Sequence, residues 1–241
     1  MAICTRYGVD AAMISPPSFS RIAVSASLIG LLAACAGTPA PDWQMNAKTA
    51  IENATTAYLE GNTRVETQEF NLARSEISRT GRTDLMARVE LTRCASRVAS
   101  LVIEKCDGFE KLRTDAAAPE RAYADYLSGK IKSQDIALLP AQHRTVAAAS
   151  SDVAAASALQ SIEDPLAKLV AAGVLFSSNR ATPAVLTAAV NTASAQGWRR
   201  PLLAWLGVQK LRAENAGDTV EAERLRRRIT LVENAAVPRQ P

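Results

Sequence analysis

The residues of this chain most able to do chemistry are one histidine and a small cluster of carboxylates. His143 lies in a polar stretch, and although histidine is the usual general base and metal ligand, we expect a surface side chain here. Glu104, Asp107 and Glu110 are close enough in sequence to suggest a metal or acid–base role, but a solvated helix end explains them more simply. The chain has no HExxH, GxSxG or Gly-rich phosphate loop. We therefore predict no catalytic residue, metal or cofactor, and a protein that is not an enzyme.

Cys94 and Cys106 raise the question of a disulfide. Their spacing, with no histidine nearby, is not a zinc pattern. In an oxidising compartment a disulfide is the default, yet on one continuous helix the two residues would lie about 18 Å apart, beyond bonding reach. A bond requires the helix to end early so that Cys106 folds back; otherwise Cys94 is a buried free thiol. The sequence leaves both outcomes open.

An uncharged apolar run precedes another cysteine near the N-terminus. The run extends from Ile22 to Ala34, follows Arg21 and ends at Cys35. As a helix it would be roughly 20 Å long, too short for about 30 Å of hydrocarbon. A basic flank, a short apolar stretch and small residues at its end are typical of a removable secretory signal.

The last four residues of this segment, Leu32-Ala33-Ala34-Cys35, resemble the bacterial lipobox. That resemblance implies that Cys35 is lipidated on its sulfur and becomes the first residue after cleavage, so the membrane is a partner through the lipid. Residue 36 is Ala and not Asp, which by the same resemblance favours the outer membrane, on its periplasmic face. An ordinary signal peptide that contains a cysteine is the alternative.

The start of the leader fits this pattern less well. Asp10 and the pair Pro16-Pro17 are unusual there, and translation from Met13 would give a cleaner signal. We expect residues 1–12 to be absent from the native protein. Residues 1–34 are then the signal peptide, and residues 35–42 form an extended, lipidated tether because they are rich in Pro and Gly.

Composition predicts an α-helical body. Residues 35–241 carry 26 Lys and Arg against 23 Asp and Glu, too balanced for a nucleic-acid partner. Aromatic residues make up only 5% of the sequence while alanine is abundant, which favours helix over sheet. We therefore predict an all-α fold of about eight to ten short helices over residues 43–234, followed by a tail at 235–241. Neighbouring helices should be antiparallel because their connections are short.

Helix boundaries can be predicted at several places. Gly61-Asn62 should end a first helix, a second should stop near Gly81, and a third should run from about Thr83 to Glu104. The apolar stripe of this third helix comprises Leu91, Cys94, Ala95, Val98, Leu101 and Val102, and its outer side carries Arg88, Glu90, Arg93 and Arg97. Residues 107–118 look like a connector and a sub-boundary of the domain.

The second half has clearer capping signals, although residues 133–162 are hard to assign. Helices should start at Pro119, after Asp164, after Thr182, at Pro201 and after Asp218, because Pro and Asp or Thr are favoured at helix starts. A break is one option at Ser150-Ser151. The last helix should bury Ala222, Leu225, Ile229 and Val232 and pair Glu223 with Arg227.

Two segments resemble tetratricopeptide repeats, which are helical hairpins with a small residue at the turn. Tyr58–Asn62 followed by Phe70 and Ala73 is the first, and Gly217-Asp218 with Ala222 and Ile229 is the second. Glu66 departs from the pattern, and the 34-residue period does not recur. We therefore predict an array of antiparallel helical hairpins, and the more specific hypothesis is a short TPR-like solenoid.

These features favour a lipid-anchored scaffold or assembly factor at the bacterial cell envelope, with a protein partner. A structural lipoprotein that tethers the cell wall is the alternative, and a cell-wall enzyme is a weaker one. Two basic segments, Trp198-Arg199-Arg200 and Arg224–Arg228, are candidate contact sites, the latter for anionic lipid. The alternatives are a Trp198 that is buried against the hairpin and a solvated, salt-bridged helix face at Arg224–Arg228. Partner identity and oligomeric state do not follow from the sequence.

Overall fold

A computed structural model describes residues 41–235, which belong to one compact unit. The described residues are all-helical, with eleven α-helices, one 3-10 helix and no strand, so the predicted all-α class is confirmed. The proposed signal peptide, the lipobox cysteine Cys35 and the tail after Ala235 lie outside the described residues. Of the proposed tether, Asp42 already forms the first residue of a helix.

The helices follow one another with short connections. Their bounds are α2 (Asp42–Glu60), α3 (Thr63–Ser78), α4 (Thr83–Ala99), α5 (Asp107–Glu110), α6 (Ala118–Leu127), η2 (Ser133–Leu138), α7 (Ala141–Ala148), α8 (Asp152–Gln160), α9 (Pro165–Ser177), α10 (Pro183–Ala195), α11 (Arg199–Asn215) and α12 (Thr219–Asn234). Segment 107–118, predicted as a connector, contains the short helix α5 and lies inside the compact unit.

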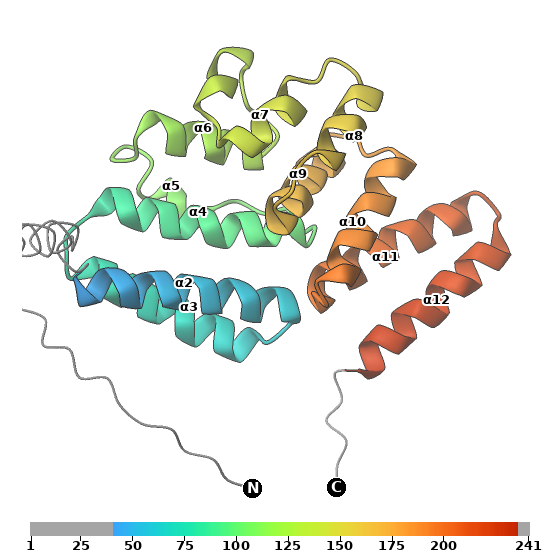
Figure 1. Cartoon of the computed structure of the whole chain (residues 1–241), viewed down its shortest axis with the longest axis horizontal. Helices are drawn as coiled ribbons and strands as arrows, with labels where there is room; N and C mark the ends of the chain where they lie inside the picture. Colours follow the sequence, from blue (N-terminus) through green and yellow to red (C-terminus); the bar gives the residue numbers. More distant parts are fainter. Residues whose placement is uncertain (1–40, 236–241) are drawn as a thin grey trace, which may run out of the picture. The chain divides into compact units, whose positions relative to one another are not determined.

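Helices α2 and α3 form an antiparallel hairpin that packs along its whole length (Figure 1). The predicted turn is present: Gly61 takes a φ of 90°, a left-handed conformation that glycine adopts without steric cost. Asn62 then caps α3 by accepting a hydrogen bond from the Val65 amide at 3.2 Å. Phe70 and Ala73 are buried on the inner side of this hairpin.

Helix α4 is the central element. Figure 1 shows it between the α2–α3 hairpin and the group formed by α5, α6 and α9, all of which it contacts. It approaches α9 very closely, because Gly173 lies directly against the backbone carbonyl of Val98. A side chain at residue 173 would occupy the space of that carbonyl, so the glycine permits the crossing.

The capping signals of the second half are largely confirmed. Asp164, Thr182 and Asp218 each accept a hydrogen bond from a first-turn amide of the helix that follows. Helix α8 also starts with such a cap, at Ser151, which places a helix break at the Ser pair. Helix α11 begins at Arg199, two residues before the predicted Pro201.

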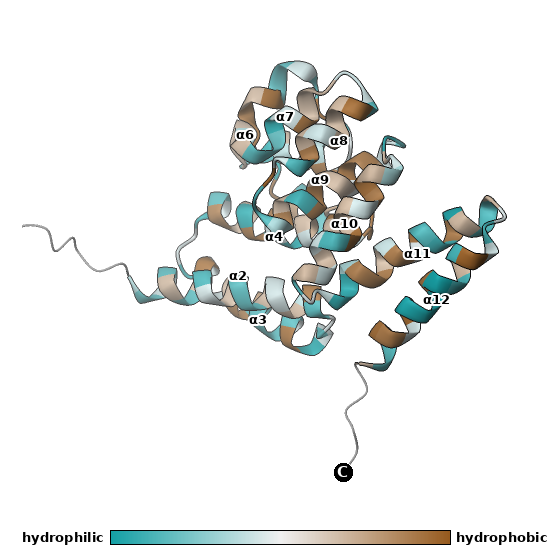
Figure 2. Ribbon diagram, turned by 45° about the vertical axis from the view of Figure 1, so that its right-hand side comes forward, coloured by the Kyte–Doolittle hydropathy of each residue, from teal (hydrophilic) through white to brown (hydrophobic). Residues whose placement is uncertain are grey.

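The apolar residues gather around α9 and α10, as the hydropathy colouring of Figure 2 shows. A second, smaller apolar cluster holds α2 and α3 against α4. Helix α12 is covered less than predicted, since Ala222 and Leu225 are buried but Ile229 and Val232 are only half-buried. Within residues 41–235, no helix combines the length and hydrophobicity that crossing a membrane requires.

Candidate functional site

His143 is buried, which corrects the prediction of a surface side chain. It is 1% exposed and lies against α6, where its Nδ1 atom is 3.5 Å from the Tyr126 hydroxyl and its ring is tilted over Tyr123. Burial lowers its pKa from 6.5 to about 4, because a charged imidazole would lose its hydration there. The histidine therefore stays neutral at ordinary pH, enclosed by tyrosines.

The structure joins Cys94 and Cys106 in a disulfide, with Cα atoms 5.9 Å apart. The bond forms because α4 ends at Ala99, five residues before the predicted Glu104. Leu101 then adopts a φ of 59°, and the Val102 amide donates to the Arg97 carbonyl, so the chain turns back along α4. The prediction of a helix to Glu104 was wrong, and Val102, placed there on the inner stripe, is exposed.

A cleft of about 570 Å³ opens beside this disulfide, between α4 and α6. The carboxylates that suggested a metal or acid site line it, but two of them are in ion pairs: Glu104 with Arg97, and Glu110 with Arg113 at 2.8 Å. The Arg113 guanidinium lowers the pKa of Glu110. Among residues 41–235 no three His, Cys, Asp or Glu side chains are grouped so that they could hold a metal ion.

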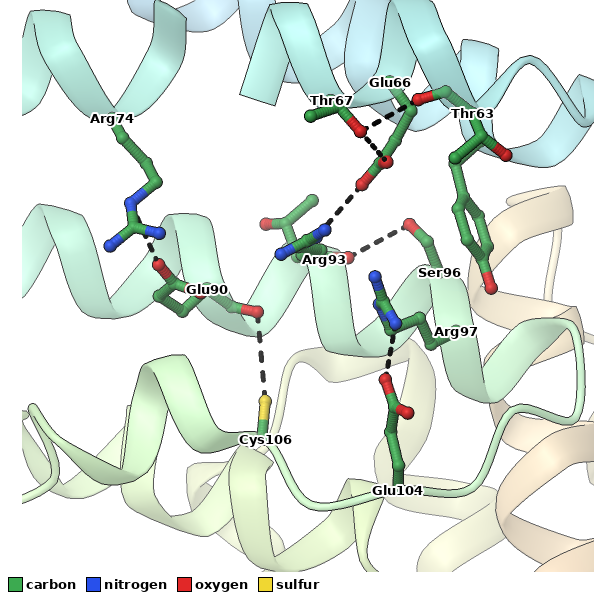
Figure 3. Close-up of polar contacts among 12 residues, drawn as sticks. Thr63, Glu66, Thr67, Arg74, Glu90, Arg93, Ser96, Arg97, Glu104 and Cys106 are labelled. Carbon is green, nitrogen blue, oxygen red and sulfur yellow. Dashed lines mark hydrogen bonds and ion pairs between the residues drawn. The ribbon is translucent and has the colours of Figure 1, made fainter. Parts of the chain in front are cut away.

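Several glutamates are buried instead of lying on helix exteriors, as Figure 3 shows for two of them. Glu66 pairs with Arg93 at 3.0 Å and also accepts a hydrogen bond from Thr67. Glu90, predicted on the outer side of α4, is 4% exposed and pairs with Arg74 at 3.4 Å. Both ion pairs join α3 to α4.

The same arrangement continues on either side of these pairs. Glu120 on α6 pairs with Arg88 of α4 at 2.7 Å, and Glu76 pairs with Arg79 at the end of α3. Two of the three arginines predicted on the outer side of α4, Arg88 and Arg93, therefore hold helices together. These ion pairs are structural, because they fix α3, α4 and α6 relative to one another. They do not bring two carboxylates into an acid–base arrangement.

The basic segment at the start of α11 is also structural. The Arg200 guanidinium donates to the Tyr58 carbonyl at 2.7 Å and to the Thr63 hydroxyl at 2.9 Å, and it lies 4.4 Å from the centre of the Tyr58 ring. These contacts bind α11 to the turn between α2 and α3. Trp198 is half-buried beside the main core, so neither side chain is presented as a contact site.

The basic run of α12 is different, because it borders an open groove. Within α12, Arg224 pairs with Glu221 and Arg226 with Glu223, both at 2.6 Å, so the predicted pairing of Glu223 with Arg227 was wrong. The groove has a volume of about 620 Å³ and lies between α10 and α12, over α11. We call it the α10–α12 groove; its lining includes Leu186, Thr187, Val190, Arg212, Ala213, Glu221, Arg224, Leu225 and Arg228.

The α10–α12 groove was not predicted from the sequence, because its lining comes from three helices whose apolar faces looked like ordinary core positions. No known protein family matches the chain, and neither a curated protein nor a solved structure is similar to it. The candidate site consequently rests on geometry and charge.

Proposed function

We propose that this chain is a lipid-anchored helical scaffold or assembly factor of the bacterial cell envelope. It faces the periplasm, favours the outer membrane, binds a protein partner and performs no catalysis. The observation that carries the binding role is the α10–α12 groove, an open cavity with apolar and charged walls on a rigid framework of packed helices.

The sequence Leu32-Ala33-Ala34-Cys35 supports the lipid anchor, and the disulfide supports the compartment. Disulfides persist in oxidising surroundings such as the periplasm and are rare in the cytosol. The bond between Cys94 and Cys106 fits a protein that has been exported. A tether that begins at Cys35 would reach the helical body within a few residues, because α2 begins at Asp42.

The framework supports the scaffold role through its cross-links between distant segments. Arg200 ties α11 to the α2–α3 turn, and the buried glutamates tie α4 to its neighbours. A platform fixed in this way holds a partner in one orientation relative to the anchor.

We also propose that the hairpins α2–α3 and α11–α12 are TPR-like units. Supporting this are the glycine turn at Gly61 and the burial of Phe70 and Ala73 against it. The departure at Glu66 has a physical reason, because this carboxylate is held by Arg93 from the neighbouring helix α4.

Crosslinking in living cells followed by mass spectrometry tests the proposal. The scaffold predicts reproducible crosslinks from the helical body to specific envelope proteins. Matched cells that carry the variant Cys35→Ser should lose the crosslinks that depend on membrane placement. Crosslinks to peptidoglycan without protein would instead identify a cell-wall tether, and hydrolysis of cell-wall fragments by the purified protein would identify an enzyme.

A further inference from the structure

Apolar side chains from three helices contribute to the lining of the α10–α12 groove, and most of their surface is packed against the core. Leu186 and Val190 come from α10, Ala213 from α11 and Leu225 from α12, and all four are less than a tenth exposed. Both outer helices pack on α11, so the groove is held open by the helices themselves (Figure 1). These residues belong to the main core, and their outer edges form the apolar part of the groove lining.

Positive charge is concentrated in these three helices. Residues 183–234 carry eight Lys and Arg against five Asp and Glu, whereas residues 41–182 carry seventeen against eighteen. The lining of the groove itself carries Arg212, Arg224 and Arg228 against Asp218 and Glu221. The lining therefore has a small excess of positive charge, which favours ligands that carry carboxylates.

Two cations of the groove are not used in ion pairs within residues 41–235. Arg212 donates only to the Ala181 carbonyl, at 3.3 Å, and Arg228 has no carboxylate within ion-pair distance. Arg224, by contrast, is held in a bidentate pair by Glu221. Arg212 stands on the floor helix α11 and Arg228 on the bordering helix α12, so a carboxylate entering the groove can meet one guanidinium at the floor and one at the α12 wall.

The rim of α12 adds apolar surface next to these cations. Val220 and Leu231 are 80% and 72% exposed, and they lie on the same side of the helix because they are eleven residues apart. Arg224 and Arg227 lie between them at helical spacing. The exposed side of α12 therefore repeats the combination found inside the groove, namely apolar residues with arginine.

We propose that the α10–α12 groove binds an acidic amphipathic segment of a partner protein. Its apolar side chains would enter between Leu186 and Leu225, and its carboxylates would pair with Arg212 and Arg228. A membrane surface fits less well, because the groove is concave and two arginines of α12 are already paired within the helix. This inference rests on the proposed scaffold function and names the class of its partner.

The test uses the lipid-anchored protein in nanodiscs of neutral phosphatidylcholine and a short fluorescent peptide of Leu and Glu at helical spacing. A matched peptide has Lys in place of Glu. We expect saturable binding of the Leu/Glu peptide, measured by fluorescence anisotropy, that weakens with added salt. The double variant Arg212→Glu with Arg228→Glu should weaken it by about tenfold or more, since close charge pairs at an interface carry binding energy of this order.

Two further variants separate groove binding from general charge. Arg64→Glu with Lys132→Glu changes the net charge equally at exposed positions outside the groove and should leave binding unchanged. Thr187→Trp places an indole at the mouth of the groove, on an exposed position, and should block binding while circular dichroism shows the native fold.

Three outcomes of the peptide measurements would overturn the inference. They are no saturable binding of the Leu/Glu peptide, equal binding of the Leu/Lys peptide, and binding that neither the groove charges nor Thr187→Trp affect. Binding of phosphatidylglycerol vesicles through Arg212 and Arg228 with no peptide binding would assign the groove to lipid and would also overturn it. The scaffold function would still be supported after such a result if crosslinks to envelope proteins are found in living cells. Only the proposed class of partner, an acidic amphipathic segment, would then be rejected.

Discussion

The indole of Trp205 donates a hydrogen bond to the main-chain carbonyl of Ala99 at 3.0 Å, across 106 positions of sequence. Both residues are fully buried. Ala99 is the last residue of α4, where helix carbonyls have no partner within the helix, so a side chain from α11 satisfies this one. The bond connects the central helix to the helix that forms the floor of the α10–α12 groove.

Trp205→Phe should therefore destabilise the fold. It leaves the Ala99 carbonyl buried without a donor, which costs about 1–3 kcal/mol, and it also alters the edge-on contact with Phe176. The measurement is the free energy of unfolding in urea, followed by circular dichroism. Trp43→Phe, at a half-buried position on α2, is the matched control and should change stability by less than about 0.5 kcal/mol. Equal effects of the two substitutions would contradict the role of this bond.

Gly173→Ala should destabilise the protein although alanine is the better helix former. In an open helix position this change stabilises by about 1 kcal/mol, but at residue 173 the methyl group would lie on the backbone carbonyl of Val98. Gly207→Ala in α11 is the control, because nothing lies within 4 Å of a side chain there. We expect a lower thermal midpoint for the first variant and an equal or higher one for the second. A rise for both would show that α4 and α9 are not in close contact.

Loss of the disulfide should increase the mobility of residues 100–106, which follow α4, while the rest of the helical domain stays folded. The bond closes a loop of twelve positions, for which chain entropy predicts a stabilisation of about 3 kcal/mol. The double variant Cys94→Ser with Cys106→Ser should lower the urea midpoint and speed hydrogen exchange at Val102, whose amide donates to the Arg97 carbonyl. A reductant should do the same to the parent protein and nothing further to the variant. Peptide mapping without reduction should find the two cysteines linked, and a pair of free thiols would refute the bond.

His143 should make the free energy of unfolding decrease as the pH falls below about 6.5. Its pKa in the folded state is about 4, below the ordinary 6.5, so the unfolded chain takes up a proton first as the pH falls. Stability should be constant above about pH 6.5 and decrease towards pH 4, by up to about 1.4 kcal/mol per pH unit. His143→Gln should remove that slope.

The titration itself can be observed by NMR, because the chain has a single histidine. We expect the imidazole to remain neutral well below pH 6. An apparent pKa near 6.5 in the folded protein would show that the ring is exposed to water, contrary to its place beside Tyr126.

The local signals of the sequence were sufficient for much of the fold. The caps at Asp164, Thr182 and Asp218 and the turn at Gly61 depend on neighbours within four residues, so they were predictable. The end of α4 was not, because Leu101 takes a left-handed conformation without the glycine that usually marks one.

The candidate site depends on contacts that no local pattern contains. Glu90 looked like a solvated residue because its partner Arg74 is far away in sequence, and the burial of Glu66 depends in the same way on Arg93. His143 looked exposed because the tyrosines that cover it belong to another helix. The α10–α12 groove likewise needs three helices at once. Charge asymmetry between residues 41–182 and 183–234 was the one sequence signal that could have indicated it.

The most direct test of the account is palmitate labelling of Cys35→Ser. A scaffold that is held at the envelope by its lipid requires this cysteine, whereas the helical body should fold without it. We predict that the variant loses palmitate labelling and appears in the soluble fraction, with the circular dichroism of the parent protein. Labelling and membrane association that survive the substitution would contradict the central claim.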